Sequence, residues 1–401
     1  MEPTSQPKFI FPALVTVTLI APLAVHMFIP ALPVVKSDLG VSDSMAYATI
    51  SWVMIVMAFA TVLYGGLSDQ WGRKPVLLTG LALYTIGAEL SWFATDIYTL
   101  LAGRIMQAAG AGCGVVLARA IARDIYGMER IAPVIANLTA AYVLGPTLAP
   151  PLGGFMIDAL GWRSIFMLAT LIGLMLILMV AVYLPETHRP TNRVRGLSSA
   201  FKTIWIEYRT LITVPRFTAY ALAPGFLSGT FFALATSSAF LATEGLQMPV
   251  EEFGLWFLFL PAGFMTGNFI SGRIGNRVSI STMTIAGSLL NVVIVLTMAA
   301  VLFIGGLSIY ALVIPGFMLG IAQGMCLPYA QAGAMHVNTA LAGSAAGAVT
   351  FSQLMFAGIS QQICGLVADS TWTPIALVMF IFSLMGLAAA LVAAFTLPKS
   401  N

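Results

Sequence analysis

Long runs of apolar residues constrain this chain more than any other feature of its sequence. A helix that crosses a bilayer needs about 20 mainly apolar residues, and runs of that length follow one another from Phe9 to Leu397. The chain is 59% hydrophobic with a mean hydropathy of +0.95, above the apolar share of an ordinary soluble domain. The sequence therefore predicts a membrane protein.

The apolar runs predict twelve membrane-spanning helices. They lack the alternation of polar and apolar residues that a transmembrane β-barrel needs, so we expect an all-helical fold. The first run is expected to be a retained helix and not a signal peptide, because no small-residue cleavage site follows it. The predicted helices are Phe9–Pro30, Met45–Leu67, Val76–Phe93, Tyr98–Arg119, Ile131–Ile157, Ser164–Leu184, Thr218–Ala242, Phe253–Gly275, Ile280–Ile304, Ile309–Gly333, Ser344–Val367 and Pro374–Leu397.

Basic residues in the loops predict how the chain crosses the membrane. Of the 18 Lys and Arg, Lys36 and Arg163 fall on the side opposite the N-terminus, Arg104 falls inside a helix, and the other fifteen fall on the side of the N-terminus. Lys and Arg gather on the cytoplasmic side. We therefore expect both termini in the cytoplasm and the protein in a bacterial inner membrane. The net charge of +3 follows from this topology, and no basic surface suited to nucleic acid is visible.

The longest polar interval divides the predicted helices into six before it and six after it. It predicts an N-terminal bundle over residues 1–184, a cytoplasmic linker over 185–217 and a C-terminal bundle over 218–401. Part of the linker, Ser198 to Leu211, has the spacing of an amphipathic helix on the inner membrane surface. The residues on its predicted apolar face are Phe201, Ile204, Trp205, Tyr208 and Leu211.

The loop after the second predicted helix, GGLSDQWGRKPV, gathers an acid and two bases in a chain with only 8% charged residues. A weaker copy, SGRIGNRVSI, follows the eighth predicted helix, with Gly272 in the place of Asp69. Such a repeat is typical of transporters built from two related halves. A simpler alternative is that the loop only fixes topology.

This loop resembles the signature G-x-L-x-D-x-x-G-R-K of the major facilitator superfamily. The residues that carry the signature are Gly65, Leu67, Asp69, Gly72, Arg73 and Lys74. The resemblance implies a twelve-helix fold of two pseudo-symmetric six-helix bundles, with the loop as a conformational latch. An acid and an Arg at facing helix ends can pair and hold the inner side shut, and we expect Asp124 as the further partner of Arg73.

Two more stretches resemble motifs of drug antiporters. LLAGRIMQAAGAG resembles the helix 4 pattern R-x-x-Q-G through Arg104 and Gln107, with Ala108 in place of the glycine. GPTLAPPLGG resembles the antiporter motif of helix 5, in which small residues allow close helix packing and proline supplies a bend. The matching residues of this second stretch are Gly145, Pro150, Gly153 and Gly154. The stretches IPALPVVKSDLG, ARAIARDIY, GWRSIF and LPET are similar to those of drug:proton antiporters of the Bcr/CflA branch, the bicyclomycin and chloramphenicol exporters.

Three ionisable residues fall inside predicted spans, where a charge costs about 2.5–3.5 kcal/mol on insertion scales. They are His26, Glu89 and Arg104. All three are expected at similar depth, roughly 5–9 Å from the middle of their helices toward the outer side of the membrane. The family usually carries an acid where His26 stands. A histidine can take over the proton transfer but not the negative charge, so we expect neutral or weakly anionic cargo.

The predicted function is the export of small amphipathic drugs or metabolites in exchange for protons by alternating access. The expected partners are that substrate, protons and membrane lipid; the protein is expected to be a monomer without metal, nucleotide or prosthetic group, and not an enzyme. An importer or facilitator of a small polar solute is the alternative within transport. A channel or signalling protein would need pore-lining charge rings or a soluble output domain, and neither is visible.

Overall fold

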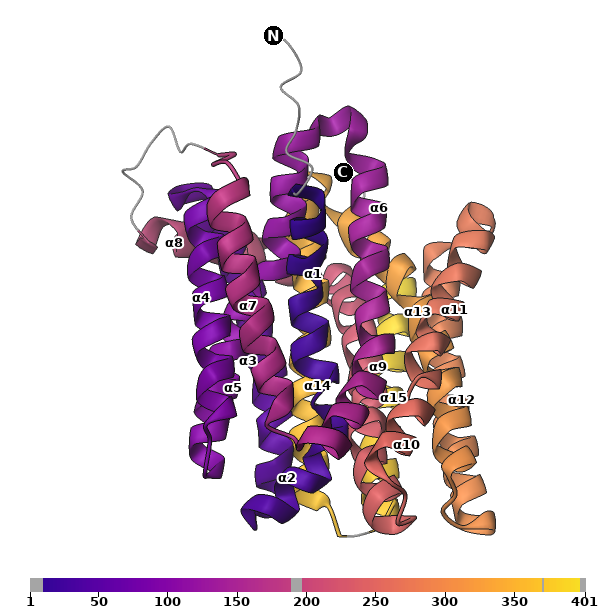
Figure 1. Ribbon diagram of the computed structural model, residues 1–401. Coiled ribbons are helices and arrows are strands. Elements are labelled where there is room, and N and C mark those ends of the chain that lie inside the picture. The colour runs from indigo at the N-terminus through magenta and orange to yellow at the C-terminus, as the bar shows by residue number, and fades with distance from the viewer. Residues whose placement is uncertain (1–9, 189–196, 370, 397–401) are drawn as a thin grey trace.

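The computed structural model describes residues 10–188, 197–369 and 371–396. Long helices run side by side through the described part (Figure 1). They are α1 (Ile10–His26), α2 (Leu32–Leu39), α3 (Asp43–Trp71), α4 (Arg73–Trp92), α5 (Ile97–Ala111), α6 (Cys113–Leu160), α7 (Ser164–Tyr183), α8 (Leu197–Ile212), α9 (Pro215–Phe240), α10 (Val250–Trp256), α11 (Phe259–Ile274), α12 (Ile280–Gly305), α13 (Ile309–Val337), α14 (Ala342–Val367) and α15 (Thr373–Phe395). Some residues of the predicted topology lie outside the described ranges: Lys8, Phe9, Arg189, Arg193, Arg195, Leu397 and Lys399.

Eleven segments of the described chain are long and apolar enough to span a bilayer. The twelfth predicted span is α4, which has 20 residues and packs against α5 and α7 (Figure 1). Its hydropathy is lower because Arg73 and Lys74 occupy its first turn and Glu89 its last turns. The structure thus has the predicted all-helical fold.

Several predicted helices are broken where the backbone loses a donor or turns sharply. The first ends at His26 instead of Pro30, because Pro30 has no N–H to continue the helix, and a short 3-10 turn, Ile29–Ala31, follows. The predicted helix Tyr98–Arg119 corresponds to α5 and the first part of α6. Helix α6 continues past Arg119, so that Asp124 lies on it, and folds back at Gly127 with φ 68° (Figure 1).

The helices form two groups. Helices α1 to α7 pack on one another, α9 to α15 pack on one another, and the main contacts between the groups join α3 to α14 and α6 to α10. We call these groups the N-half and the C-half. The linker helix α8 contacts α3, α9 and α14. Of its predicted apolar face, Leu211 is buried and Trp205 is exposed, while the side chains of Phe201 and Ile204 lie outside the described part.

The two copies of the loop motif share a backbone feature. Gly72 ends α3 with φ 95°, and Gly275 ends α11 with φ 52°, a region that favours glycine. The second copy therefore keeps a glycine with positive φ at the helix end, although Gly272 replaces the acid.

Candidate functional site

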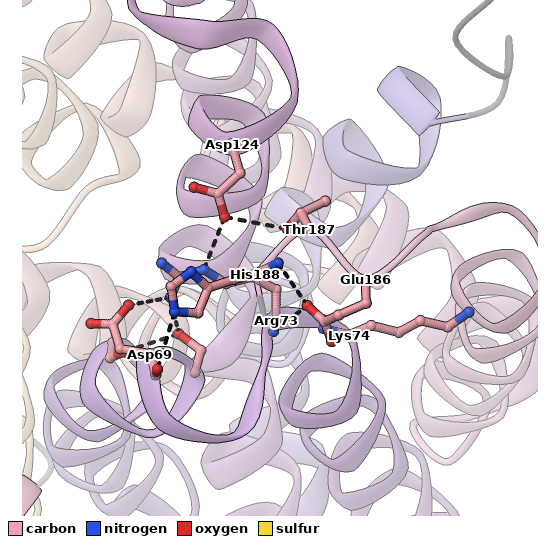
Figure 2. A network of polar contacts seen from close by, with 9 residues as sticks. Asp69, Arg73, Lys74, Asp124, Glu186, Thr187 and His188 are labelled. Atoms are coloured by element: carbon pink, nitrogen blue, oxygen red, sulfur yellow. Dashed lines mark hydrogen bonds and ion pairs between the residues drawn. The ribbon is translucent and has the colours of Figure 1, made fainter. Parts of the chain in front are cut away.

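The loop motif forms a polar network at one end of the N-half (Figure 2). Arg73 begins α4 with its side chain buried. Its Nη1 lies 2.6 Å from Oδ1 of Asp69, and its Nε lies 3.1 Å from Oδ2 of the expected partner Asp124. The guanidinium therefore joins the end of α3 to α6. We call this group, with Lys74, Glu186, Thr187 and His188, the loop network, and its end of the molecule the network end.

Glu186 is a member that the sequence did not single out. Its carboxylate accepts hydrogen bonds from the backbone N–H groups of Arg73, at 2.9 Å, and Lys74, at 3.2 Å. These are among the first N–H groups of α4, which have no partner inside the helix and favour a negative charge. Lys74 also donates from Nζ to the carbonyl of Ala181, at 2.8 Å. The segment after α7 is thus held against the start of α4.

Gly72 is required by the network for two reasons. Its φ of 95° is one that other residues rarely adopt, and an added Cβ would lie 2.6 Å from Oε2 of Glu186. Gly65 differs, since a Cβ there would meet only Cγ1 of Val116 at an ordinary 3.9 Å. Of these two motif glycines, only Gly72 is fixed by its surroundings.

The contacts of the loop network stay inside one half of the molecule in this conformation. The hydrogen bonds and ion pairs of the loop network, including His188 to the Asp69 carbonyl and Thr187 to Asp124, all lie within the N-half across the described residues. The network therefore braces α3, α4 and α6 against the end of α7. It does not hold the two halves together here.

The polar contacts between the halves lie toward the opposite end. Lys36 of α2 pairs with Glu244, which follows α9, at 3.0 Å. Tyr47 of α3 donates to Ser237 of α9 at 2.9 Å, and Ser51 donates to Gln362 of α14 at 2.6 Å. Because these α3 residues precede Asp69 along one continuous helix, they lie far from the network end. The molecule is closed at the end opposite the loop network, which we call the closed end.

The glycines of the helix 5 motif contact two different neighbours of α6. A Cβ on Gly145 would lie 2.8 Å from Cγ of Pro22 in α1, and one on Gly153 would collide with the Met27 carbonyl. Gly154 faces the C-half instead, where a Cβ would lie 3.0 Å from the Val250 carbonyl of α10. The motif therefore allows close packing both inside the N-half and between the halves. Pro150 takes part in the contact between the halves, because a Cβ added to Gly254 of α10 would lie 2.9 Å from the Pro150 carbonyl.

His26 lies between the halves. It is the last residue of α1, is 7% exposed, and its ring centroid lies 5.7 Å from that of Phe232 in α9. Its Nδ1 is buried and has no hydrogen-bond partner among the described residues. Glu89, by contrast, is exposed on α4. The structure therefore separates two residues that the sequence grouped by depth.

Arg104 is buried inside the N-half and does not contact His26. Its Nη1 donates to the carbonyl of Ala24, at 2.7 Å, and to Oε1 of Gln107, at 2.8 Å, while its Nε donates to the Thr49 carbonyl, at 3.2 Å. Ala24 lies in the last turn of α1, where carbonyls lack a partner within the helix and favour a cation. Arg104 thus fixes the end of α1 from which His26 projects.

Comparison with known proteins decides the family. The family model described as "Major Facilitator Superfamily" matches residues 14–361 of this chain. The chain belongs to the major facilitator superfamily. The fold class and family predicted from the loop signature are therefore confirmed, and this member of the superfamily is a multi-pass membrane transporter and not an enzyme.

Relatives of this superfamily member include proteins of the drug-resistance branch. The chain is 27% identical over 378 residues to Multidrug resistance protein D of Escherichia coli (strain K12), covering 93% of this chain and 92% of that protein. It is 26% identical over 270 residues to a bicyclomycin resistance protein homolog of Haemophilus influenzae, covering 66% of each. An uncharacterized MFS-type transporter, YdgK of Bacillus subtilis (strain 168), is 26% identical over 92% of this chain and 91% of its own length.

Solved structures of the superfamily share the fold. A D-xylose-proton symporter superposes with a TM-score of 0.77 at 14% identity, covering 97% of this chain and 98% of that chain. The xylose transporter XylE from E. coli in an inward open conformation gives a TM-score of 0.71 at 14% identity, covering 98% and 96%. At this level of identity the likeness concerns the fold alone.

Proposed function

We propose that this transporter exports small amphipathic compounds in exchange for protons, with His26 as the proton-carrying residue. The observation that carries the proposal is the place of His26, buried between the halves against Phe232 with an unpaired Nδ1. The relatives named for multidrug and bicyclomycin resistance support export, as does the helix 5 motif. The proposed setting is a bacterial inner membrane, with a monomer whose termini are both cytoplasmic.

Proton antiport requires a site whose tendency to hold a proton changes between the two access states. At the closed end, protein surrounds the imidazole of His26 and separates it from water. When α1 and α9 separate there, water reaches the ring and allows it to take a proton. His26 would then bind a proton from the outer side and release it after closure, while cargo leaves in the other direction.

The cargo preference follows from charge. His26 replaces the acid that the family usually carries. Arg104, a permanent cation, donates a hydrogen bond to the Ala24 carbonyl at the same end of α1. Two of the acids at the closed end, Asp43 and Glu244, are paired with Lys36. We therefore propose neutral or weakly anionic amphipathic compounds of the amphenicol type in preference to lipophilic cations.

Transport by purified protein in liposomes tests this proposal. When protons flow down their gradient in the direction opposite to the movement of an amphenicol, the wild type should move the drug against its concentration gradient. An uncoupler should abolish this uphill transport. His26→Ala should remove uphill transport while leaving drug binding, and His26→Asp should restore coupling and improve recognition of cations. The matched control is His336→Ala, because His336 is exposed at the end of α13. Uphill transport by His26→Ala at the wild-type rate would refute the role of His26, and co-movement of drug and protons would indicate the importer instead.

A further inference from the structure

Arg104 is a buried cation without an acidic partner. Only 1% of its surface is exposed, and its three hydrogen-bond acceptors, on Thr49, Ala24 and Gln107, are all neutral. No carboxylate of the described residues lies within ion-pairing distance of it. Its Nη2 is buried and, among the described residues, has no acceptor. One donor of the guanidinium and its net charge are therefore uncompensated.

Aromatic rings offset only part of this cost. The guanidinium carbon lies 4.5 Å from the ring centre of Phe28 and 5.6 Å from that of Phe166. Such contacts attract a cation electrostatically, but a buried charge is normally paired with an opposite charge. A ring face supplies no lone pair to Nη2. The site still lacks a negatively charged acceptor.

A small pocket adjoins this group. It lies between α1, α4, α5 and α7, and Arg104, Gln107 and Tyr84 supply its polar lining, with apolar residues such as Ala169 around them. The free space has room for about one water-sized particle. An organic substrate does not fit such a space, so the pocket is distinct from the place between the halves where His26 lies.

We propose that this pocket is a binding site for a small monoatomic anion, chloride in the first instance. Chloride is only slightly larger than water, accepts hydrogen bonds from several donors, and cancels the charge of Arg104, which water does not. The Tyr84 hydroxyl, which is buried on the same pocket wall, supplies a second donor. Bound chloride would hold α1, α4, α5 and α7 together from inside the N-half.

The test is thermal unfolding of the purified full chain in nanodiscs, without substrate. Chloride and bromide are compared with gluconate at constant ionic strength and pH. Wild-type Tm should rise by about 2 °C or more with chloride or bromide and reach a plateau, as expected for a ligand that binds the folded state. An equal Tm in chloride and gluconate would overturn the proposal and leave a water molecule as the occupant.

Two variants of the pocket and one control variant make the test specific to the pocket. Ala169→Leu should fill the space and abolish the halide response, whereas the same change at Ala181, which is exposed on the same helix, should leave it unchanged. Tyr84→Phe should raise the halide concentration of half-maximal response severalfold. A wild-type response in Ala169→Leu would overturn the assignment. Because the readout is stability, this outcome is independent of whether the transporter exports drugs.

Discussion

The Nζ atom of Lys36 lies 3.0 Å from Oε2 of Glu244, and this ion pair joins the two halves of the transporter at the closed end. Lys36 lies on α2, and Glu244 lies in a π-helical turn, Leu241–Gly245, that follows α9. Lys36 also contacts Asp43 of its own half at 2.7 Å. Because α2 and α9 must separate if the closed end opens, this pair is one that opening has to break.

Glu244→Gln should therefore shift the molecule toward opening at the closed end. The pair is partly exposed, with side chains 25% and 46% accessible. It therefore stabilises the closed state by about 1 kcal/mol at most, which changes the equilibrium between closed and open states by up to about fivefold. Spin labels at the exposed residues Ser37 and Glu252 would report the distance between the halves. Arg163→Gln is the control, because Arg163 pairs with Asp38 within the N-half at 3.0 Å; an equal shift in both variants would contradict a role in gating.

Gly72→Ala should destabilise the protein, whereas Gly65→Ala should not. The first change forces a side chain into a φ of 95° and against the Glu186 carboxylate, at a cost of about 1–3 kcal/mol. The second places a methyl group in ordinary contact with Val116, with an effect within about 0.5 kcal/mol. Thermal unfolding in detergent compares them directly. Equal losses would show that the motif glycines matter for a reason other than local geometry.

Glu186→Ala should lower stability by about 1–2 kcal/mol, because it leaves two N–H groups at the start of α4 without their acceptor. Glu186→Gln keeps an acceptor and should lose less. Unfolding midpoints of the two variants against wild type measure the difference. Should the alanine variant unfold with the wild-type midpoint, the hydrogen bonds from Glu186 to the start of α4 contribute nothing to stability.

Gly154→Val should weaken closure between the halves, since its side chain would enter the space occupied by the Val250 carbonyl and Glu251 of α10. Spin-label distances at the closed end should lengthen, and transport should fall. Gly145→Val should instead reduce stability, because its collision with Pro22 lies inside the N-half. Gly272→Val is the control, as an added Cβ there has no neighbour within 4 Å. Unchanged distances in Gly154→Val would show that α6 and α10 accommodate the bulk.

The loop network shows how far sequence reasoning reached. Asp69, Gly72 and Arg73 form a contiguous motif, and Asp124 was anticipated as a helix-end acid near Arg73. Glu186 was not, because it lies 113 residues from Arg73 and its bonds go to backbone N–H groups, which leave no trace in side-chain patterns. A carboxylate shortly after a span, on the same side as the start of another, is the signal that could have indicated it.

The sequence by itself determined the number of spans and the turns between them. Bilayer thickness fixes the length of each apolar run, and glycine at positions such as Gly72 is a local requirement of the backbone. Only the tertiary structure decided what each polar side chain faces. The sequence places His26 and Arg104 at similar depth in the membrane, yet His26 faces the C-half and Arg104 lies inside the N-half. Depth is set along a helix axis, whereas partners are set by rotation about it, and that rotation depends on how neighbouring helices pack.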